Sequence, residues 1–366
     1  MTFTFKKAAF GGLATIGAVA LMAGCASAPE ESGGDSGGEA LDYLPCMVSD
    51  AGGFDDKSFN QLGAEGLDRA ADELGVEAKK VESQAETDYA SNLQSLVDQG
   101  CDTIVTVGFL LAPAALESAT ANPDLEYVSI DDTVDQDFNG ETDAPNIKPI
   151  IFDTAQAAFL VGYLSAGVSE TGSVGTYGGL NIPTVSIFMD GFAQGVDYYN
   201  EENGTDVKVL GWDREAQDGS FTGGFEANDT ARQVAQGLID QNIDILLPVG
   251  GPIYQSGAAA IRDSGRDIKL IGVDADVYET DPSVGDLLLT SILKGIDVGV
   301  EDAIVSAGNG EFDPSPFVGT LENEGVGVAP FHDFEDAVPA DLSSKLDELK
   351  QMIIDGDITV ESYLAQ

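Results

Sequence analysis

Short apolar segments alternate with longer amphipathic segments from residue 42 onward. Short apolar runs bounded by turn residues are typical of buried strands, and apolar positions spaced by three or four residues indicate helices. We predict strands at residues 45–48, 79–81, 103–107, 127–130, 147–152, 173–177, 207–210, 245–249, 269–272 and 288–292. We predict helices at residues 60–74, 89–99, 111–121, 154–168, 187–203, 228–240, 253–263, 297–308 and 341–354. This alternation favours an α/β fold built on parallel sheets.

The strand–helix units form two sets, which suggests two domains for a chain of 366 residues. A stretch rich in Asp, Asn, Gly and Pro at residues 131–146 separates the two sets. The C-terminal helix is predicted from apolar residues at helical spacing, namely Leu342, Leu346, Leu349 and Ile353.

The N-terminus has the three parts of an export signal: Lys6 and Lys7, an uncharged run at residues 8–24, and a cleavage region. The run is shorter than the roughly 20 apolar residues of a membrane-spanning helix. Residues 21–25 resemble a bacterial lipobox, which predicts cleavage after residue 24 and a lipid on Cys25; the alternative is an ordinary secretory signal cut after residue 28. Residues 25–41, rich in Gly, Ser and acids, are expected to be a flexible tether on the outer face of a membrane.

Composition excludes several classes of function. The formal net charge is −48, and such a surface repels the phosphate backbone of nucleic acids. The single histidine, His332, disfavours Ser-His-Asp triads and histidine-rich zinc sites. Three cysteines cannot form a four-thiolate metal site. We therefore predict neither a metal nor a cofactor.

Cys46 and Cys101 remain after the N-terminal cysteine is assigned to the lipid anchor. Cysteine pairs in exported proteins are candidates for disulfides. Each of the two opens a predicted strand, so a bridge is possible if those strands are neighbours in the sheet. The alternative is a pair of buried thiols.

In open parallel sheets, ligands bind beyond the carboxyl ends of the strands. The residues that follow predicted strands are therefore candidates for the site: Asp50, Gly108, Phe109, Asp131, Asp132, Gly250, Gly251, Asp274 and Lys294. They include no nucleophile–base pair and no Gly-x-Gly-x-x-Gly phosphate loop. This set indicates binding rather than catalysis, and we predict no catalytic residue.

Several motifs carry a family resemblance. The segment Asp50-Ala-Gly-Gly-Phe-Asp-Asp-Lys-Ser-Phe-Asn-Gln61 resembles the signature of the basic membrane protein (PnrA-like) family, which comprises nucleoside-binding lipoproteins of ABC transporters. Further matches lie, in order along the chain, at residues 108–109, 157–163, 188–195, 247–251, 271–276 and 289–294.

The resemblance implies a type I periplasmic-binding-protein fold, in which two Rossmann-like lobes are joined by three hinge segments. One lobe would comprise residues 42–130 and 277–315, and the other 150–272 and 316–335. Residues 131–149 and 273–276 would belong to the hinge, and residues 336–366 would form a C-terminal helix and tail. The expected partners are a nucleoside and an ABC permease, with the protein a monomer held to the membrane by its lipid.

The resemblance also implies a purine base stacked between two aromatic rings, which by position are Phe59 and Phe188, with Phe192 as a competitor. Asp50 and Asn60 would bind the edge of the base, and Asp131, Asp274 and Lys294 the ribose. Gly250 would allow the backbone to approach the sugar. Phe109, Asp132 and Gly251 are secondary candidates.

Other interpretations remain open. Asp50 and Asn60 are also good helix caps, and a lysine such as Lys294 is usually a surface ion-pair partner. The same fold could bind a sugar or another heterocycle. An exported nucleoside hydrolase that uses Asp50 or Asp274 as its base is the third possibility.

Overall fold

The computed structural model describes residues 41–136 and 139–364. The predicted export signal, the lipidation site at Cys25 and almost all of the predicted tether lie outside the described residues. Within the described ranges, none of the helices combines the length and the apolar composition that crossing a bilayer requires.

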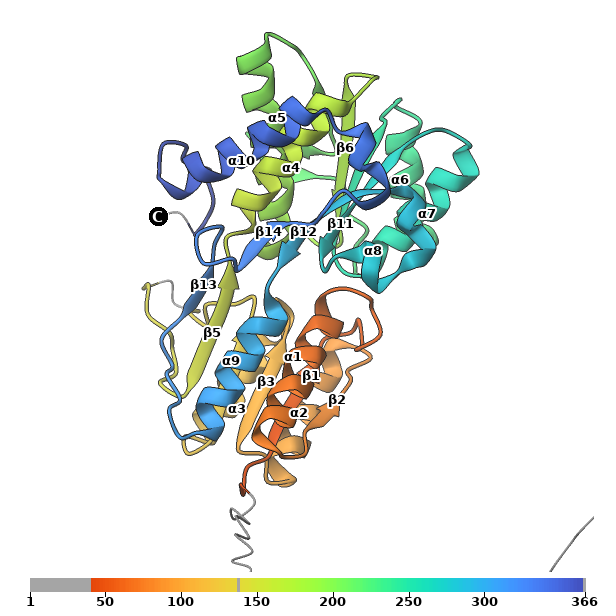
Figure 1. The fold of residues 1–366 in the computed structure, drawn as a ribbon. Coiled ribbons are helices and arrows are strands. Elements are labelled where there is room, and N and C mark those ends of the chain that lie inside the picture. The colour runs from red at the N-terminus through yellow and green to blue at the C-terminus, as the bar shows by residue number, and fades with distance from the viewer. Residues whose placement is uncertain (1–40, 137–138, 365–366) are drawn as a thin grey trace, which may run out of the picture. The chain divides into compact units, whose positions relative to one another are not determined.

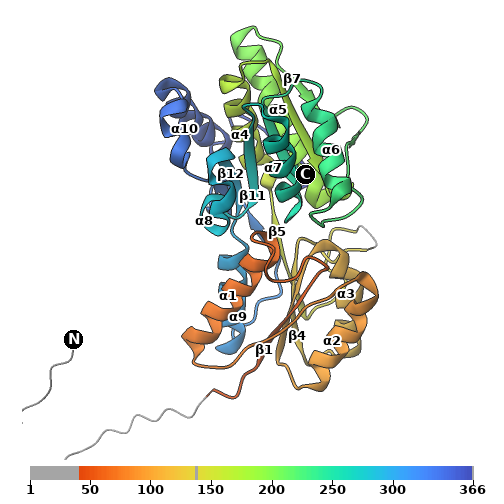
Figure 2. The same ribbon diagram turned by 90° about the vertical axis from the view of Figure 1, so that its right-hand side faces the viewer.

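The first of two six-stranded sheets lies in the lobe that contains the beginning of the described chain (Figure 1). Its strands, in spatial order, are β13 (Phe317–Gly319), β5 (Ile147–Phe152), β4 (Glu126–Ile130), β3 (Thr103–Val107), β1 (Pro45–Ser49) and β2 (Lys79–Val81). All of its pairings are parallel. The helices that pack on it are α1 (Phe59–Leu74), α2 (Tyr89–Asp98), α3 (Ala112–Ala121) and α9 (Ile296–Gly308). Figure 2 shows α1 and α9 on one side of β1 and β4, with α2 and α3 on the other.

The second sheet repeats this arrangement. Its strands, in spatial order, are β14 (Val326–Val328), β12 (Leu288–Lys294), β11 (Lys269–Asp274), β10 (Ile245–Val249), β6 (Ser173–Gly178) and β7 (Lys208–Leu210). Only the pairing of β14 with β12 is antiparallel among these described strands. Its helices are α4 (Thr154–Val168), α5 (Pro183–Asn203), α6 (Asp229–Ile239), α7 (Ile253–Ser264), α8 (Val277–Thr280) and α10 (Ala340–Ile354), and a small hairpin pairs β8 (Trp212–Asp213) with β9 (Asp218–Gly219).

The predicted α/β fold with two parallel-sheet lobes is confirmed. Every predicted strand is present within one or two residues of its predicted bounds. The main helical difference is α5, which begins at Pro183 rather than at residue 187. Proline is favoured in the first turn of a helix, where its missing N–H costs no intrahelical bond.

The predicted division into lobes is wrong at three places. β5 pairs with β4 and β13 in the first sheet, whereas β12 pairs with β11 and β14 in the second. The chain therefore crosses between the sheets near Asp153, near Gly295 and at residues 320–325, not within 131–149 or 273–276. The polar stretch that suggested a boundary is a loop of the first lobe, because the Asp143 N–H bonds back to the Val134 carbonyl oxygen at 2.8 Å.

The three crossings are joined to one another by backbone hydrogen bonds. The N–H of Asp153 donates to the carbonyl of Gly319 at 2.8 Å, and the N–H of Gly295 donates to the carbonyl of Gly325 at 2.9 Å. We expect three adjacent connections to act as a hinge between the two lobes.

Two glycines bring α4 and α5 into close contact in the core. A Cβ atom at Gly195 would lie 1.9 Å from the backbone oxygen of Phe159, and one at Gly162 would lie 2.0 Å from that of Phe192. Backbone atoms at such distances cannot be relieved by a rotamer change, so these positions require glycine.

We predict that Gly195→Ala lowers the free energy of unfolding by about 3 kcal/mol, because the added methyl group forces α4 and α5 apart. Gly237→Ala is the matched control: a Cβ at Gly237 meets nothing within 4 Å, so alanine should stabilise α6 by about 0.5–1 kcal/mol. Urea unfolding followed by circular dichroism measures both. Equal effects of the two substitutions would contradict the packing argument.

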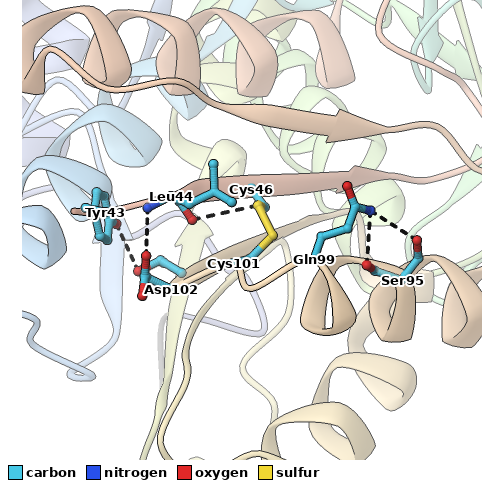
Figure 3. The surroundings of a disulfide bond; sticks show 8 residues. Tyr43, Leu44, Cys46, Ser95, Gln99, Cys101 and Asp102 are labelled. Carbon is cyan, nitrogen blue, oxygen red and sulfur yellow. Dashed lines mark hydrogen bonds between the residues drawn. A yellow bond between two sulfur atoms is a disulfide. The ribbon is translucent and has the colours of Figure 1, made fainter. Parts of the chain in front are cut away.

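The structure joins Cys46 and Cys101 in a disulfide, with a Cα–Cα distance of 6.0 Å (Figure 3). Parallel pairing of β1 with β3 brings the two residues together, since Cys46 lies opposite Ile104 and Cys101 immediately precedes β3. The bridge closes a loop with a sequence separation of 55 residues.

We predict that replacing both cysteines by alanine lowers the free energy of unfolding by about 2–4 kcal/mol, because the unfolded chain regains the entropy of that loop. Urea denaturation of the wild type with and without dithiothreitol is the control. If the bridge stabilises the fold, the reductant should shift the wild type toward the double variant and leave the variant unchanged.

Candidate functional site

A cavity lies where the carboxyl ends of strands from the two sheets converge. The residues of the first lobe that line it are Asp50, Gly52, Asp56, Phe59, Asn60, Gly108, Phe109, Leu110 and Asp131. Those of the second lobe are Ile182, Thr184, Val185, Phe188, Phe225, Val249, Gly250, Gly251, Pro252, Asp274 and Lys294. A concave site lined by aromatic and apolar side chains with a few convergent polar groups is typical of small-molecule binding.

The start of α1 is fixed by one buried carboxylate. Asp56 accepts hydrogen bonds from the backbone N–H groups of Ser58 at 3.0 Å, Asn60 at 2.9 Å and Gln61 at 3.0 Å. These bonds satisfy donors that the first turn of a helix otherwise leaves unpaired. Asp56 therefore holds Phe59 and Asn60 at the edge of the pocket.

Asn60 and Asp50 form a polar pair on the wall of the first lobe. Asn60 donates from Nδ2 to Asp50 Oδ1 at 2.8 Å, and its own Oδ1 is buried with no hydrogen-bond partner in the described part of the chain. Buried polar atoms normally have partners. An unpaired acceptor beside the cavity therefore suits an N–H or O–H donor on a ligand.

Gly108 allows the Asp50 carboxylate to sit against the end of β3. A Cβ at Gly108 would lie 2.7 Å from Asp50 Oδ2, and the residue has a φ of 118°, which favours glycine. Burial raises the pKa of Asp50 from 3.8 to about 6, while hydrogen bonds from Gly52 and Asn60 oppose the shift. Asp50 is therefore a carboxylate at neutral pH that takes up a proton in mildly acidic solution.

Two aspartates occupy corresponding positions in the two lobes. Asp131 follows β4 with a φ of 69°, and Asp274 ends β11 with a φ of 67°. Aspartate tolerates this left-handed conformation better than most side chains, and such strain often marks functional positions. Both residues are buried, with 5% of their surface exposed.

Lys294, at the end of β12, connects these carboxylates across the lobes. Its Nζ donates to Asp131 Oδ2 at 2.6 Å and lies 3.8 Å from Asp274 Oδ1. Burial raises the pKa of Asp274 to about 6, and the positive charge of Lys294 opposes the shift. Of the described residues that line the pocket, Lys294 is the only cation, which makes it the one positive charge among four aspartates.

Aromatic rings surround this charged group. The Nζ of Lys294 lies 5.0 Å from the ring centroid of Phe59, 5.3 Å from that of Phe188 and 5.5 Å from that of Phe152. Phe188 is almost wholly buried, with 1% exposed, whereas Phe225 is only partly buried. The Phe225 ring packs on the backbone of Gly250, where a Cβ would lie 2.7 Å away.

The structure brings together eleven of the predicted site residues, which are Asp50, Phe59, Asn60, Gly108, Phe109, Asp131, Phe188, Gly250, Gly251, Asp274 and Lys294. Phe192 and Asp132 do not line the pocket. Phe192 is wholly buried in the main core cluster, one helical turn beyond Phe188. Asp132 turns its carboxylate to the backbone N–H of Val134 at 2.5 Å.

The sequence analysis missed two important lining residues, Asp56 and Phe225. The hydrogen bonds that Asp56 accepts from three backbone N–H groups could have been suspected from its place just before a predicted helix. Phe225 lies in an irregular loop, and no periodic pattern marks it. Gly250 was expected to let the backbone approach a sugar, but in the structure the Phe225 ring occupies the space beside Gly250.

Comparisons with known proteins identify the family of this chain. The family model for the PnrA-like ABC transporter substrate-binding proteins matches residues 44–362. The CD4+ T-cell-stimulating antigen of Listeria monocytogenes is 28% identical over 93% of this chain and 94% of that protein. The ABC transporter nucleoside-binding protein BmpA of Lactococcus lactis is 26% identical over 95% of this chain and 96% of its own length.

Among solved structures, a solute-binding protein of an ABC transporter system from Aeropyrum pernix superposes with a TM-score of 0.76 at 27% identity. That match covers 87% of this chain and 92% of the other. The chain therefore belongs to the PnrA-like family of ABC transporter substrate-binding proteins, which bind a solute for a transporter and are not enzymes.

Proposed function

We propose that the solute is a nucleoside, bound between the lobes and delivered to the permease of an ABC importer. The observation that carries the proposal is the pairing of aromatic rings from both lobes with a cluster of two carboxylates and one ammonium group in the same pocket. Aromatic rings suit stacking on a flat base. Carboxylates beside an ammonium group suit hydrogen bonds to the adjacent hydroxyls of a sugar. The printed description of the Lactococcus relative, a nucleoside-binding protein, supports the same choice.

In this proposal the base stacks on Phe59, which belongs to the first lobe. The second lobe offers Phe188, expected from the sequence, and Phe225. We favour Phe225 as the stacking partner because its ring is partly exposed, whereas Phe188 is almost fully covered and packs beside Lys294. Phe188 then forms the floor of the pocket. The edge of the base meets Asp50, which accepts hydrogen bonds, and the unpaired Oδ1 of Asn60.

The ribose hydroxyls would donate to Asp131 and Asp274 and accept from Lys294. Both carboxylates already lie within 4 Å of the Lys294 ammonium group, whose positive charge offsets their mutual repulsion when a sugar binds. Excess negative charge in the pocket disfavours a ligand that carries a phosphate. We also propose that a lipid on Cys25 tethers the protein to the outer face of the membrane, within reach of the permease.

We predict that Phe59→Leu and Phe225→Leu each weaken nucleoside binding by about tenfold, since leucine keeps apolar volume but loses the stacking face, which contributes roughly 1–3 kcal/mol per base. Phe188→Leu should weaken binding less. Isothermal titration with guanosine, inosine, uridine and ribose measures the effect, with the melting temperature of each variant as the control for folding. A larger loss of affinity for Phe188→Leu than for Phe225→Leu would identify Phe188 as the stacking ring. Binding of ribose alone would show that the solute is a sugar and not a nucleoside.

We predict that the affinity for nucleoside falls as the pH falls below 6. Burial raises the pKa of Asp50 and of Asp274 to about 6, so each takes up a proton and loses its strength as an acceptor near that pH. Uptake of one proton weakens binding by about tenfold per pH unit. Titrations from pH 7.5 to 5 at constant salt measure the slope, and Asp50→Asn should reduce it.

Unfolding of the protein should not be the cause of the lower affinity at acidic pH. A raised carboxyl pKa means that the folded state binds protons more tightly than the unfolded state, so these two groups favour folding more as the pH falls from 6 toward 3.8. Thermal unfolding at each pH separates the two effects. A pH-independent affinity over this range would show that neither carboxylate accepts a hydrogen bond from the ligand.

A further inference from the structure

The amide of Asn60 has one fixed orientation on the pocket wall. Its Nδ2 donates to Asp50 Oδ1 at 2.8 Å and to Asp56 Oδ2 at 3.3 Å, so both amide hydrogens are used inside the protein. The reversed orientation would place the amide oxygen against two carboxylates, which repel it. Asn60 is 2% exposed, and its Oδ1 has no partner among the described residues. Asn60 therefore offers a ligand an acceptor only.

Asp50 is held in place by donors on one side only. Its Oδ1 accepts from the N–H of Gly52 at 3.0 Å and from the Nδ2 of Asn60 at 2.8 Å. Its Oδ2 accepts no hydrogen bond from the residues that the structure describes, and it lies against Gly108 on the pocket wall, where a Cβ would be 2.7 Å away. Asp50 Oδ2 is therefore a second acceptor beside the Oδ1 of Asn60.

The other side chains on the first-lobe wall of the pocket also lack a hydrogen to donate. Among the described residues they are phenyl groups, alkyl groups and carboxylates. Asp56 accepts from backbone N–H groups at the start of α1, and Asp131 accepts from Lys294. A base that meets these side chains must therefore supply the hydrogen atoms itself.

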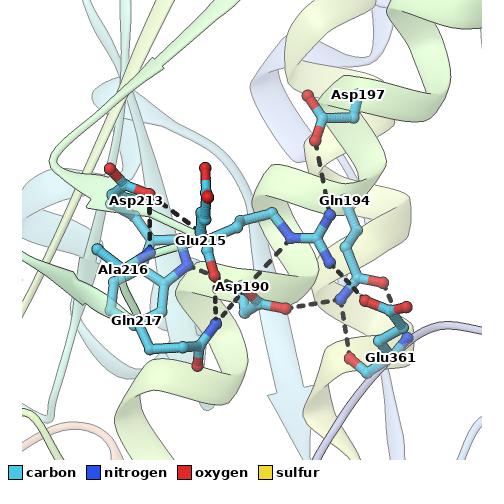
Figure 4. A network of polar contacts seen from close by, with 10 residues as sticks. Asp190, Gln194, Asp197, Asp213, Glu215, Ala216, Gln217 and Glu361 are labelled. Atoms are coloured by element: carbon cyan, nitrogen blue, oxygen red, sulfur yellow. Dashed lines mark hydrogen bonds and ion pairs between the residues drawn. The ribbon is translucent and has the colours of Figure 1, made fainter.

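A polar network around Asp190 on α5 provides a contrast. Asp190 Oδ2 accepts from Gln194 at 2.8 Å, and Oδ1 accepts from Trp212 at 3.0 Å, Arg214 at 3.2 Å and Gln217 at 3.2 Å (Figure 4). Both carboxylate oxygens have partners within the protein, and Asp190 does not line the ligand pocket. This network stabilises the second lobe, whereas the two acceptors on the pocket wall are left for a ligand.

We propose that the pocket selects guanine nucleosides, because Asp50 and Asn60 recognise the base by accepting two hydrogen bonds from it. The inference rests on the proposed function, since it takes the solute to be a nucleoside. Guanine carries two neighbouring donor groups, the ring N1–H and the amino group on C2.

The other common bases fit this pair of acceptors less well. The amino group of adenine or cytosine is the only donor group on its edge and has ring nitrogen acceptors beside it. The ring N–H of uracil or hypoxanthine lies beside carbonyl oxygens. An acceptor of the base that faces Asp50 or Asn60 leaves two buried lone pairs without a hydrogen, which weakens binding.

The first test is isothermal titration of the full chain with guanosine, inosine and adenosine at pH 7.5. Asp50 is a carboxylate at that pH, because burial raises its pKa only to about 6. We expect inosine, which lacks the amino group, to bind about tenfold more weakly than guanosine, and adenosine about tenfold to a hundredfold more weakly. Adenosine that binds as tightly as guanosine overturns the inference.

The second test is Asp50→Asn, which keeps the shape of the side chain. Its amide oxygen should stay on the donors of Gly52 and Asn60, so the amide nitrogen takes the place of Oδ2 and becomes a donor. We expect the ratio of guanosine affinity to adenosine affinity to fall by about tenfold or more, since an acceptor of the base now suits that position. Equal weakening of both nucleosides would mean a merely structural role for Asp50 and overturns the inference.

Asp190→Asn is the matched control. It makes the same chemical change in the network of Figure 4, away from the pocket, so the affinity ratio should stay that of the wild type. The melting temperatures of both variants report on folding. Nucleoside binding without a preference for guanosine contradicts this inference alone, whereas a wild type that binds no nucleoside contradicts the proposed function and the inference with it.

Discussion

The buried ion pair between Lys294 and Asp131 is the interaction on which the site depends. It joins the end of β12 in the second lobe to the end of β4 in the first, at 2.6 Å and with both side chains shielded from solvent. A buried charge is tolerated only when it is paired, and removal of one partner leaves the other uncompensated. The second carboxylate, Asp274, and three phenyl rings lie around the ammonium group of this pair.

The repeated strand order explains why two such carboxylates meet. Leaving aside the edge strands β13 and β14, the first sheet runs β5-β4-β3-β1-β2 and the second β12-β11-β10-β6-β7, the same order in both lobes. This order has its switch point beside the first strand of each sheet, where open α/β sheets bind ligands. Asp131 after β4 and Asp274 at the end of β11 are equivalent positions, so two lobes that face each other bring them to one pocket.

Contacts between the lobes extend beyond the ion pair. Ser58 donates from its hydroxyl to the Val273 carbonyl at 2.9 Å and to Asp274 Oδ2 at 3.1 Å, and Thr280 donates to the Lys57 carbonyl at 2.6 Å. These bonds involve Lys57 and Ser58, which belong to the loop that Asp56 holds in place at the start of α1. The motif at residues 50–61 therefore does two things: it presents Phe59 and Asn60 to the ligand, and it supplies the polar surface on which the second lobe closes.

The sequence by itself determined the elements, because apolar periodicity reports burial along one strand or helix and needs no knowledge of its neighbours. It also placed Asp131, Asp274 and Lys294 among the site candidates, since residues that follow parallel strands meet at one edge. It could not assign β5, β12 and β13 to their sheets, because pairing joins residues far apart in the chain through backbone groups that every residue carries. For the same reason only the tertiary structure decided which aromatic rings face the cavity: Phe188 and Phe192 share a helix, Phe225 lies in a loop, and packing against distant residues sets the exposure of each.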